Sequence, residues 1–191
     1  MIALSQIKDP SDIRSLSLEE CEVLADDIRA KIIQTVSQNG GHLSSNLGVV
    51  EITLALHRVF NTPADKIIFD VGHQTYAHKL ITGRYDQFDT LRTYGGIAGF
   101  PRRSESEYDC FDAGHASTAI SSALGMARAR DALHQDHHVI AVVGDGATSE
   151  EGLLDRLLIA LLGEDEGHIA ISTIVVVWVE TLGYSCVTIR V

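Results

Sequence analysis

The sequence predicts an α/β domain of three layers, in which a mostly parallel sheet carries helices on both faces. Two short runs rich in β-branched residues, 66–70 and 138–144, are apolar at consecutive positions, which is typical of strands covered on both sides. Segments with helical periodicity separate these runs. Each run ends at glycines and polar residues, and in open parallel sheets ligands bind beyond such carboxyl ends. The pattern therefore favours a ligand-binding domain of alternating strands and helices.

Length and composition narrow the class of protein. The 191 residues, 45% of them hydrophobic, are enough for one domain with a substantial core, so we expect a single domain over residues 1–191. A formal net charge of -11 argues against nucleic-acid and anionic-membrane partners, because basic patches bind both. The three cysteines lack the spacing of a metal site, which fits reduced thiols. With no signal peptide and no membrane-spanning run evident, we predict a cytoplasmic protein.

The first third of the chain predicts two helices joined by a loop. Residues 17–20, Ser-Leu-Glu-Glu, match a capping box, and apolar residues follow at helical spacing as far as Val36. Two glycines at 40–41 should end this helix. A loop of small residues follows with His42 at its centre, and a second helical pattern covers residues 49–59.

The rest of the chain alternates between strands, loops and helices. In order, we expect a strand at 66–70, a turn at 71–74, a long loop at 84–112, a helix from 113–118 to about His134, a strand at 138–144, a helix at 150–162 and a last strand at about 174–179. A long ordered loop is usually functional. The small residues that open the helix at 113–118 favour an anion at its N-terminus.

The end of the run 138–144 carries the most informative residue, Asp145, which stands between Gly144 and Gly146. Glycines let a ligand approach the backbone closely, but a carboxylate repels phosphate unless a divalent cation lies between them. Mg²⁺ bridges carboxylates and phosphate oxygens in this way. Alone, Gly-Asp-Gly also fits a tight turn before a helix. The glycine spacing of a dinucleotide site and the alternate acids of an EF-hand are not met.

Five short motifs, taken in order, resemble the N-terminal domain of the 1-deoxy-D-xylulose-5-phosphate synthase family, which belongs to the transketolase superfamily. The motifs are Gly-Gly-His-Leu-Ser-Ser at 40–45, Asp-Val-Gly-His-Gln at 70–74, Ser-Glu-Ser-Glu-Tyr-Asp at 104–109, Gly-His-Ala-Ser-Thr at 114–118 and Gly-Asp-Gly at 144–146. The resemblance extends from about Leu18 to Gly146.

This resemblance implies a thiamine-diphosphate-binding domain of the pyrophosphate type. It also implies thiamine diphosphate and Mg²⁺ as cofactors, and the condensation of pyruvate with glyceraldehyde 3-phosphate with release of CO₂. The product of that reaction feeds isoprenoid, thiamine and pyridoxol synthesis. In such enzymes the cofactor supplies the carbanion chemistry, and the protein supplies position and electrostatics.

The resemblance also assigns roles to residues of this chain. It implies proton transfer for His42, a task that imidazoles in general suit because their unperturbed pKa lies near neutrality, and it implies Mg²⁺ binding for Asp145. It implies cofactor binding for a set of residues that follow the strands or open the helix: His73, Gly114, His115, Ala116, Gly144, Gly146 and Ala147.

Two features depart from the family. In the family an asparagine after the next strand completes the Mg²⁺ site, whereas every asparagine of this chain precedes Asp145. The positional substitutes are Ser172 or Thr173 by residue count, and Glu180 or Thr181 by the apolar pattern. The pyrimidine-side and C-terminal domains are also absent from the sequence, and with them the remaining cofactor and substrate contacts.

We therefore expect turnover only together with the missing part, through a homodimer or a second-domain polypeptide. Two alternatives to a synthase-like chain remain at this point. One is the N-terminal subunit of a split transketolase, and the other is a non-catalytic remnant that binds diphosphate or acts as an interaction module. The Ser-Glu-Ser-Glu-Tyr-Asp motif at 104–109 favours the synthase over the split transketolase.

Overall fold

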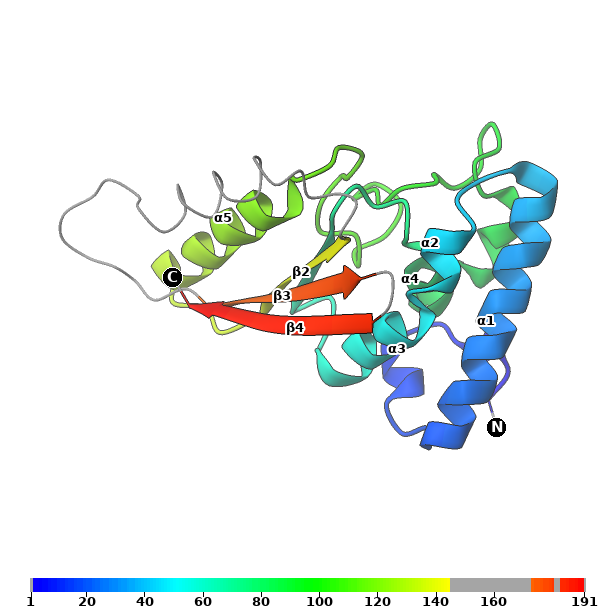
Figure 1. Ribbon diagram of the computed structural model, residues 1–191, viewed down its shortest axis with the longest axis horizontal. Coiled ribbons are helices and arrows are strands. Elements are labelled where there is room, and N and C mark those ends of the chain that lie inside the picture. The colour runs from blue at the N-terminus through cyan, green and yellow to red at the C-terminus, as the bar shows by residue number, and fades with distance from the viewer. Residues whose placement is uncertain (1, 145–172, 181–182, 191) are drawn as a thin grey trace.

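In the described part of the chain, the sheet has four strands in the order β1-β2-β3-β4 (Figure 1). The computed structural model describes residues 2–144, 173–180 and 183–190. The strands are β1 (Lys66–Phe69), β2 (Val139–Gly144), β3 (Thr173–Glu180) and β4 (Gly183–Arg190). The pairs β1–β2 and β2–β3 are parallel, and β3–β4 is antiparallel. The mostly parallel sheet is thereby confirmed, and β4 is a strand that the sequence pattern did not predict.

Helices cover both faces of the sheet, which confirms the three-layer prediction. On one face, Ile68 and Ala141 pack with Ala123 of α5 (Ala119–Ala132). On the other face, Ile140 packs with Leu56 of α3 (Val50–Val59). Successive residues of a strand point to opposite faces, so consecutive apolar residues in β1 and β2 are what a sheet buried on both sides requires.

The long helix α1 (Leu18–Asn39) begins and ends where the sequence predicts. The Ser17 side chain accepts a hydrogen bond from the Glu20 amide, and the Glu20 carboxylate accepts one from the Ser17 amide, so the capping box is confirmed. Gly40 ends the helix with φ 73°, a conformation that favours glycine. With the N-terminal segment and α3, α1 forms an apolar core beside the sheet.

Short helical segments and loops make up the rest of the described structure. The helical segments are the 3₁₀ helices Leu4–Gln6 and Pro10–Ile13, α2 (Ser44–Leu47), α4 (Tyr76–Lys79), the π turn Leu80–Arg84 and the 3₁₀ helix Tyr85–Thr90. A loop then runs to α5, which begins at Ala119 rather than at the predicted 113–118. Ser117 has φ 62°, which is incompatible with a right-handed helix, so the helix cannot start earlier.

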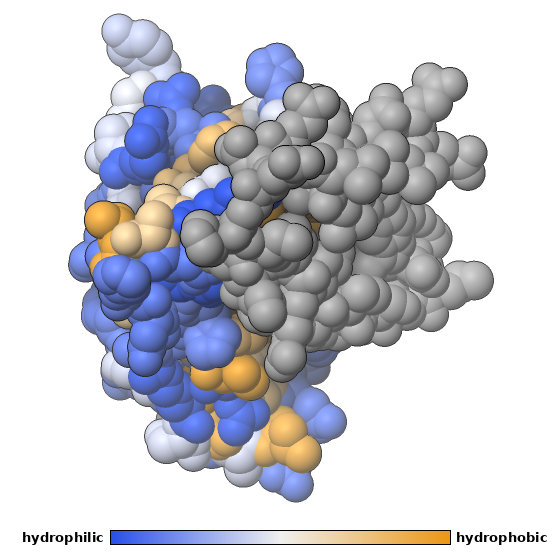
Figure 2. Space-filling model, turned by 90° about the vertical axis from the view of Figure 1, so that its left-hand side faces the viewer, coloured by the Kyte–Doolittle hydropathy of each residue, from blue (hydrophilic) through white to orange (hydrophobic). Residues whose placement is uncertain are grey.

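The described residues on the face that Figure 2 shows are mainly hydrophilic, with hydrophobic residues among them in small groups. Within the described residues, no helix is long and apolar enough to cross a membrane. The predicted helix at 150–162 and the residues Asp145, Gly146 and Ala147 lie outside the described residues.

Candidate functional site

The structure brings together His42 and His73, two of the residues that the sequence singles out. His42 lies in the loop between α1 and α2, and His73 lies in the turn that follows β1. Their ring centroids are 5.1 Å apart and the ring planes meet at 69°. His42 is exposed and His73 is half-buried. The pair therefore lies at the surface, at the carboxyl end of a parallel strand, where α/β folds bind ligands.

Asn46 connects the two segments that carry these histidines. Its Nδ2 donates hydrogen bonds of 2.7 Å to the backbone carbonyls of His42 and His73. Its Oδ1 accepts a hydrogen bond of 2.9 Å from the backbone N–H of Tyr76. Sequence reasoning missed Asn46, because an asparagine among glycines and serines ordinarily indicates a turn. Only the fold reveals that its partners come from two distant segments.

The turn that carries His73 has a strained backbone. Val71 has φ 58° and Gly72 has φ 84°, and a positive φ is rare for a β-branched residue. A Cβ on Gly72 would lie 2.5 Å from Cδ of Pro101 and 2.9 Å from Cβ of Ala113. The long loop therefore packs directly on the turn and holds it in this conformation. Backbone strain of this kind is concentrated at ligand-binding and catalytic sites.

Polar atoms next to this turn lack partners. The Nδ1 atom of His73 is buried and has no hydrogen-bond partner among the described residues, and the same is true of Oε1 of Gln74. Burial and then the neighbouring His42 lower the pKa of His73, so its imidazole is neutral near pH 7. Buried polar atoms are normally paired, so an orphaned ring nitrogen beside a second imidazole indicates that a ligand completes the site.

The N-terminus of α5 does not offer the free anion site that the sequence predicts. The carboxylate of Asp70, at the end of β1, accepts hydrogen bonds from the amides of Ser117, Thr118 and Ala119 at 2.8 to 3.0 Å. An internal carboxylate thus takes the place that we expected for an external anion, because it bears the charge that a helix N-terminus favours.

The turn before α5 remains open to a ligand. Gly114, His115 and Ala116 are exposed, and the contact between Ala113 and Gly72 places this turn beside the one that carries His73. A Cβ on Gly114 would meet nothing within 4 Å. These three predicted cofactor residues therefore lie near the histidine pair, with space around Gly114.

Gly144 lies at the same edge of the sheet. It ends β2, and the parallel register Phe69↔Val142 places the carboxyl ends of β1 and β2 side by side. A Cβ on Gly144 would also meet nothing within 4 Å. Asp145 follows Gly144 directly but lies outside the described residues, so its predicted role in metal binding stays a prediction.

The sheet register separates the candidates for a second metal ligand. Gly144 pairs with Val179, so position 180 lies at the edge where β2 ends. Thr173 begins β3 at the opposite end, roughly 20 Å away at the rise of a strand, so Thr173 is wrong as a partner for Asp145. Ser172 and Thr181 lie outside the described residues. Within the part of the chain that the structure describes, no group of three His, Cys, Asp or Glu residues could hold a metal ion.

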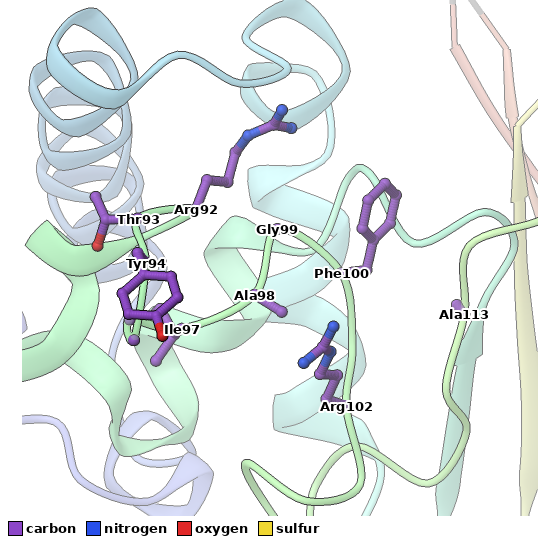
Figure 3. A pocket seen from close by; sticks show the side chains of 11 residues that line it. Arg92, Thr93, Tyr94, Ile97, Ala98, Gly99, Phe100, Arg102 and Ala113 are labelled. Carbon is purple, nitrogen blue, oxygen red and sulfur yellow. The ribbon is translucent and has the colours of Figure 1, made fainter.

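A pocket of about 630 Å³ is lined by the long loop and by Ala113. Figure 3 shows the guanidinium groups of Arg92 and Arg102 and the ring of Phe100 projecting from this loop. The Arg92 side chain packs against Gly41, the neighbour of His42, since a Cβ on Gly41 would lie 3.5 Å from Cδ of Arg92. Neither arginine side chain forms an ion pair with another described residue, so the pocket suits an anion.

The layered fold defines an α/β domain with its candidate site at the ends of the parallel strands, and the arrangement of its elements is similar to that of a transketolase. A solved structure of a transketolase variant from Pichia stipitis matches with a TM-score of 0.60, over 71% of this chain and 24% of that chain. The sequence identity is 19%, so this likeness concerns the fold alone.

Sequence comparison identifies the family. A family profile described as 1-deoxy-D-xylulose-5-phosphate synthase matches residues 4–172, and the chain belongs to this family. The synthase of Syntrophotalea carbinolica is 55% identical over 179 residues, or 89% of this chain. The synthase of Desulfotalea psychrophila is 54% identical over 176 residues, or 87% of this chain. The chain spans 28% and 27% of the lengths of these two relatives.

Proposed function

We propose that this chain is the diphosphate-binding part of a 1-deoxy-D-xylulose-5-phosphate synthase. With thiamine diphosphate and Mg²⁺, and with the remainder of the enzyme, it would condense pyruvate with glyceraldehyde 3-phosphate and release CO₂. The observation that carries the proposal is the contact between His42 and His73 at the end of β1, with one ring nitrogen unpartnered. The family membership of residues 4–172 supports the same conclusion and favours it over a split transketolase.

The residues at the sheet edge fit such a cofactor. His73 presents a buried nitrogen without a partner, and Gly114 and Gly144 leave open the space that side chains would fill. When bound, thiamine diphosphate would supply the carbanion chemistry that no amino acid side chain provides. In this proposal His73, Gly114, His115, Ala116 and Gly144 line the cofactor, and Gly146 and Ala147 continue that lining.

The two histidines would have different tasks. His73 is half-buried, and burial keeps its imidazole neutral, so it can orient a ligand by a single hydrogen bond without adding charge. His42 is exposed and stands edge-on to His73, so it can reach a substrate that approaches from solvent. An imidazole in that position is suited to moving a proton near neutral pH.

Charge balance supports a metal ion in the site. The chain has a net charge of -11, so a diphosphate needs a local cation. Asp145 is the candidate ligand for Mg²⁺, because it follows the last residue of β2 at this edge of the sheet. Glu180, the last residue of β3, occupies the neighbouring position in the register and is the candidate for the second ligand.

The pocket lined by the long loop suits the proposed substrates. Pyruvate carries a carboxylate and glyceraldehyde 3-phosphate carries a phosphate, and the guanidinium groups of Arg92 and Arg102 favour both kinds of anion. We further propose that the chain works in the cytoplasm, either as a dimer or with a separate polypeptide that provides the rest of the enzyme.

Calorimetry of the purified chain tests the cofactor. We expect thiamine diphosphate to bind in the presence of Mg²⁺ and not after chelation by EDTA. Asp145→Ala should abolish this Mg²⁺-dependent binding, whereas Asp112→Ala, which changes a carboxylate of an exposed ion pair, should leave binding unchanged. A wild-type chain that binds no thiamine diphosphate with Mg²⁺ would overturn the proposal.

A complementation assay tests the activity. The remainder of the Syntrophotalea synthase is expressed as a separate polypeptide and mixed with this chain, and formation of deoxyxylulose phosphate is measured. We expect no turnover by either polypeptide alone and turnover by the mixture. Turnover by the mixture should fail with His42→Ala while binding of thiamine diphosphate persists, since His42 is assigned to proton transfer.

A further inference from the structure

Asn46 is fully buried, and the hydrogen bonds of its side chain go to backbone atoms of His42, His73 and Tyr76. Its two donors bind the carbonyls of His42 and His73, and its acceptor binds the N–H of Tyr76 at the start of α4. A single side chain thus joins the loop before α2 to the turn after β1. A buried amide with three good partners rigidifies the groups that it joins.

The chemistry of the amide group is required at this position. A reversed amide would direct Oδ1 at two carbonyl oxygens and Nδ2 at an N–H group, so all three contacts would become repulsive. Aspartate has the same shape as asparagine and would keep the acceptor for Tyr76 but lose both donors. The two links to the histidine carbonyls therefore depend on asparagine itself.

A second hydrogen bond fixes the backbone N–H of His42. The His42 N–H donates to the hydroxyl of Tyr76 at 3.4 Å, and Tyr76 is fully buried. Gly41 allows this approach, because a Cβ there would lie 2.7 Å from the Tyr76 hydroxyl oxygen. Both backbone polar groups of His42 are thus bound, the carbonyl by Asn46 and the N–H by Tyr76, while the His42 side chain is free to face solvent.

We infer that Asn46 is a positioning residue, which sets the separation and angle of the His42 and His73 rings at the proposed site. Asn46 acts through the backbone of the two histidines and is therefore not a catalytic residue. The inference rests on the proposed function only for the identity of the ligand, because the ring geometry is a property of the chain without any ligand.

The test compares Asn46→Ala and Asn46→Asp with Thr53→Val. Thr53 is 1% exposed and its hydroxyl donates to the Val49 carbonyl at 2.7 Å, so Thr53→Val removes one buried hydrogen bond without touching either histidine. Two readouts are taken by NMR on the chain without cofactor. They are the nuclear Overhauser effect between the His42 and His73 rings and the titration of the His73 side chain. The buried contact between His57 and His78 serves as an internal reference.

We expect both Asn46 variants to lose the His42–His73 contact and to move the His73 titration toward its ordinary value. Thr53→Val should keep both, and the His57–His78 contact should persist in all three variants. Calorimetry with thiamine diphosphate and Mg²⁺ should give binding about tenfold weaker for the Asn46 variants, and unchanged for Thr53→Val. If Asn46→Ala does not fold, Asn46→Ser, which keeps one donor, takes its place with the same readouts.

Folded Asn46 variants that keep the ring contact and the wild-type titration would overturn the inference. So would an equal loss in Thr53→Val, since Asn46 would then contribute only general stability. Failure of the proposed function gives a different result: the wild-type chain would bind no thiamine diphosphate, while the ring contact would still depend on Asn46.

Discussion

Two pairs of histidines in this protein have the same ring separation and different surroundings. The ring centroids of His57 and His78 are 5.1 Å apart, as are those of His42 and His73. The first pair is stacked at 24° and is 0% and 1% exposed, whereas the second pair meets at 69° near the surface. Ring proximity alone therefore does not distinguish a structural pair from a functional one, and the hydrogen-bond partners of each pair have to be compared.

The buried pair is part of a chain of satisfied hydrogen bonds. Burial lowers the pKa of both His57 and His78 and, at His78, outweighs the opposing hydrogen bond to Asp109, so both rings are neutral. A neutral His78 must donate from Nε2 to the Asp109 carboxylate, and its Nδ1 must then accept from Nε2 of His57. The Nδ1 atom of His57 accepts from the Thr62 hydroxyl, so every ring nitrogen has a partner.

Asp109 anchors this chain to the long loop. Its carboxylate also accepts two hydrogen bonds from the Arg84 guanidinium and one from the backbone N–H of Arg102. Burial alone would raise the pKa of Asp109, but the hydrogen bonds from His78 and Arg84 outweigh it and hold the pKa well below its usual range. The carboxylate is therefore ionised, and both of its oxygens accept hydrogen bonds from the protein, so it offers no free acceptor to a ligand.

The difference between the pairs indicates how to separate structural from ligand-binding polar groups in this fold. Around His57 and His78 every ring nitrogen is used, and the network ties α3, α4 and the long loop together. At His73 a ring nitrogen is unused, the adjoining backbone is strained, and Gly114 leaves open space. We therefore expect substitutions at the first pair to affect folding and substitutions at the second to affect binding.

The largest effect should come from Asp109→Ala. It leaves the Arg84 guanidinium, 4% exposed, with only the more distant Glu105 carboxylate at 3.8 Å, and breaking one side of a buried ion pair costs about 3–5 kcal/mol. Urea denaturation should show this loss in the free energy of unfolding. Asp112→Ala is the control, because its ion pair with Arg103 is exposed and worth about 1 kcal/mol at most. A loss below about 1 kcal/mol in Asp109→Ala would remove the structural role that we give to this network.

The second-largest effect should be a loss in the free energy of unfolding at acidic pH, which comes from the same buried network. Both histidines have folded-state pKa values below the unfolded value of about 6.5, so below that pH the unfolded chain binds more protons and stability falls. The loss approaches about 1.4 kcal/mol per pH unit for each histidine while the folded ring stays neutral. Below about pH 4 the lowered pKa of Asp109 adds to the loss in the same direction.

Unfolding free energies at pH 7, 6 and 5 check this expectation. His57→Gln should reduce the slope with pH, and His134→Gln, at an exposed position after α5, should not change it. Equal slopes in His57→Gln and the wild-type chain would mean that the buried pair is not the source of the acid sensitivity.

Gly72→Ala should have a smaller effect on stability and a specific effect on the ligand site. The new Cβ would lie 2.5 Å from Pro101 at a residue with φ 84°, so the turn that carries His73 must shift, at a cost of about 1–3 kcal/mol. The His42–His73 ring contact should be lost while the His57–His78 contact stays. Gly125→Ala, inside α5 with nothing within 4 Å of its Cβ, should instead stabilise the chain by about 0.5–1 kcal/mol. Thermal unfolding and NMR of both variants test the contrast.

The sequence predicted those parts of the structure that depend on local patterns. The capping box at Ser17 placed the start of α1, and consecutive apolar residues predicted β1 and β2. Contacts between distant segments were beyond such patterns. The predicted start of α5 was wrong, because the carboxylate of Asp70, which belongs to a distant segment, accepts hydrogen bonds from the backbone amides that precede and begin the helix. The β4 segment mixes polar and apolar residues without strict alternation, so periodicity did not predict it.

At the candidate site, too, local patterns were predictable and contacts between distant segments were not. His42 and His73 were each singled out through the family resemblance, and their proximity was not predicted, because no local pattern connects a loop at 40–45 with a turn at 70–74. The sequence did not single out Asn46, which joins them, and the motif at 104–109 included Asp109 without indicating the hydrogen bonds that distinguish the buried pair from the exposed pair. Both residues act through partners that only the folded chain brings near.

The smallest effect on stability should come from His42→Ala, which makes this variant the sharpest test of the comparison. The His42 side chain is exposed, and the two hydrogen bonds that hold the residue use its backbone, so they survive the substitution. We expect the free energy of unfolding to change by less than about 0.5 kcal/mol. His78→Ala, at the same ring separation from its partner, should lose several times more because it leaves His57 and Asp109 without a shared partner. Similar losses in the two variants would mean that His42 is a structural residue like His78, and that the exposed pair owes its geometry to folding rather than to a ligand.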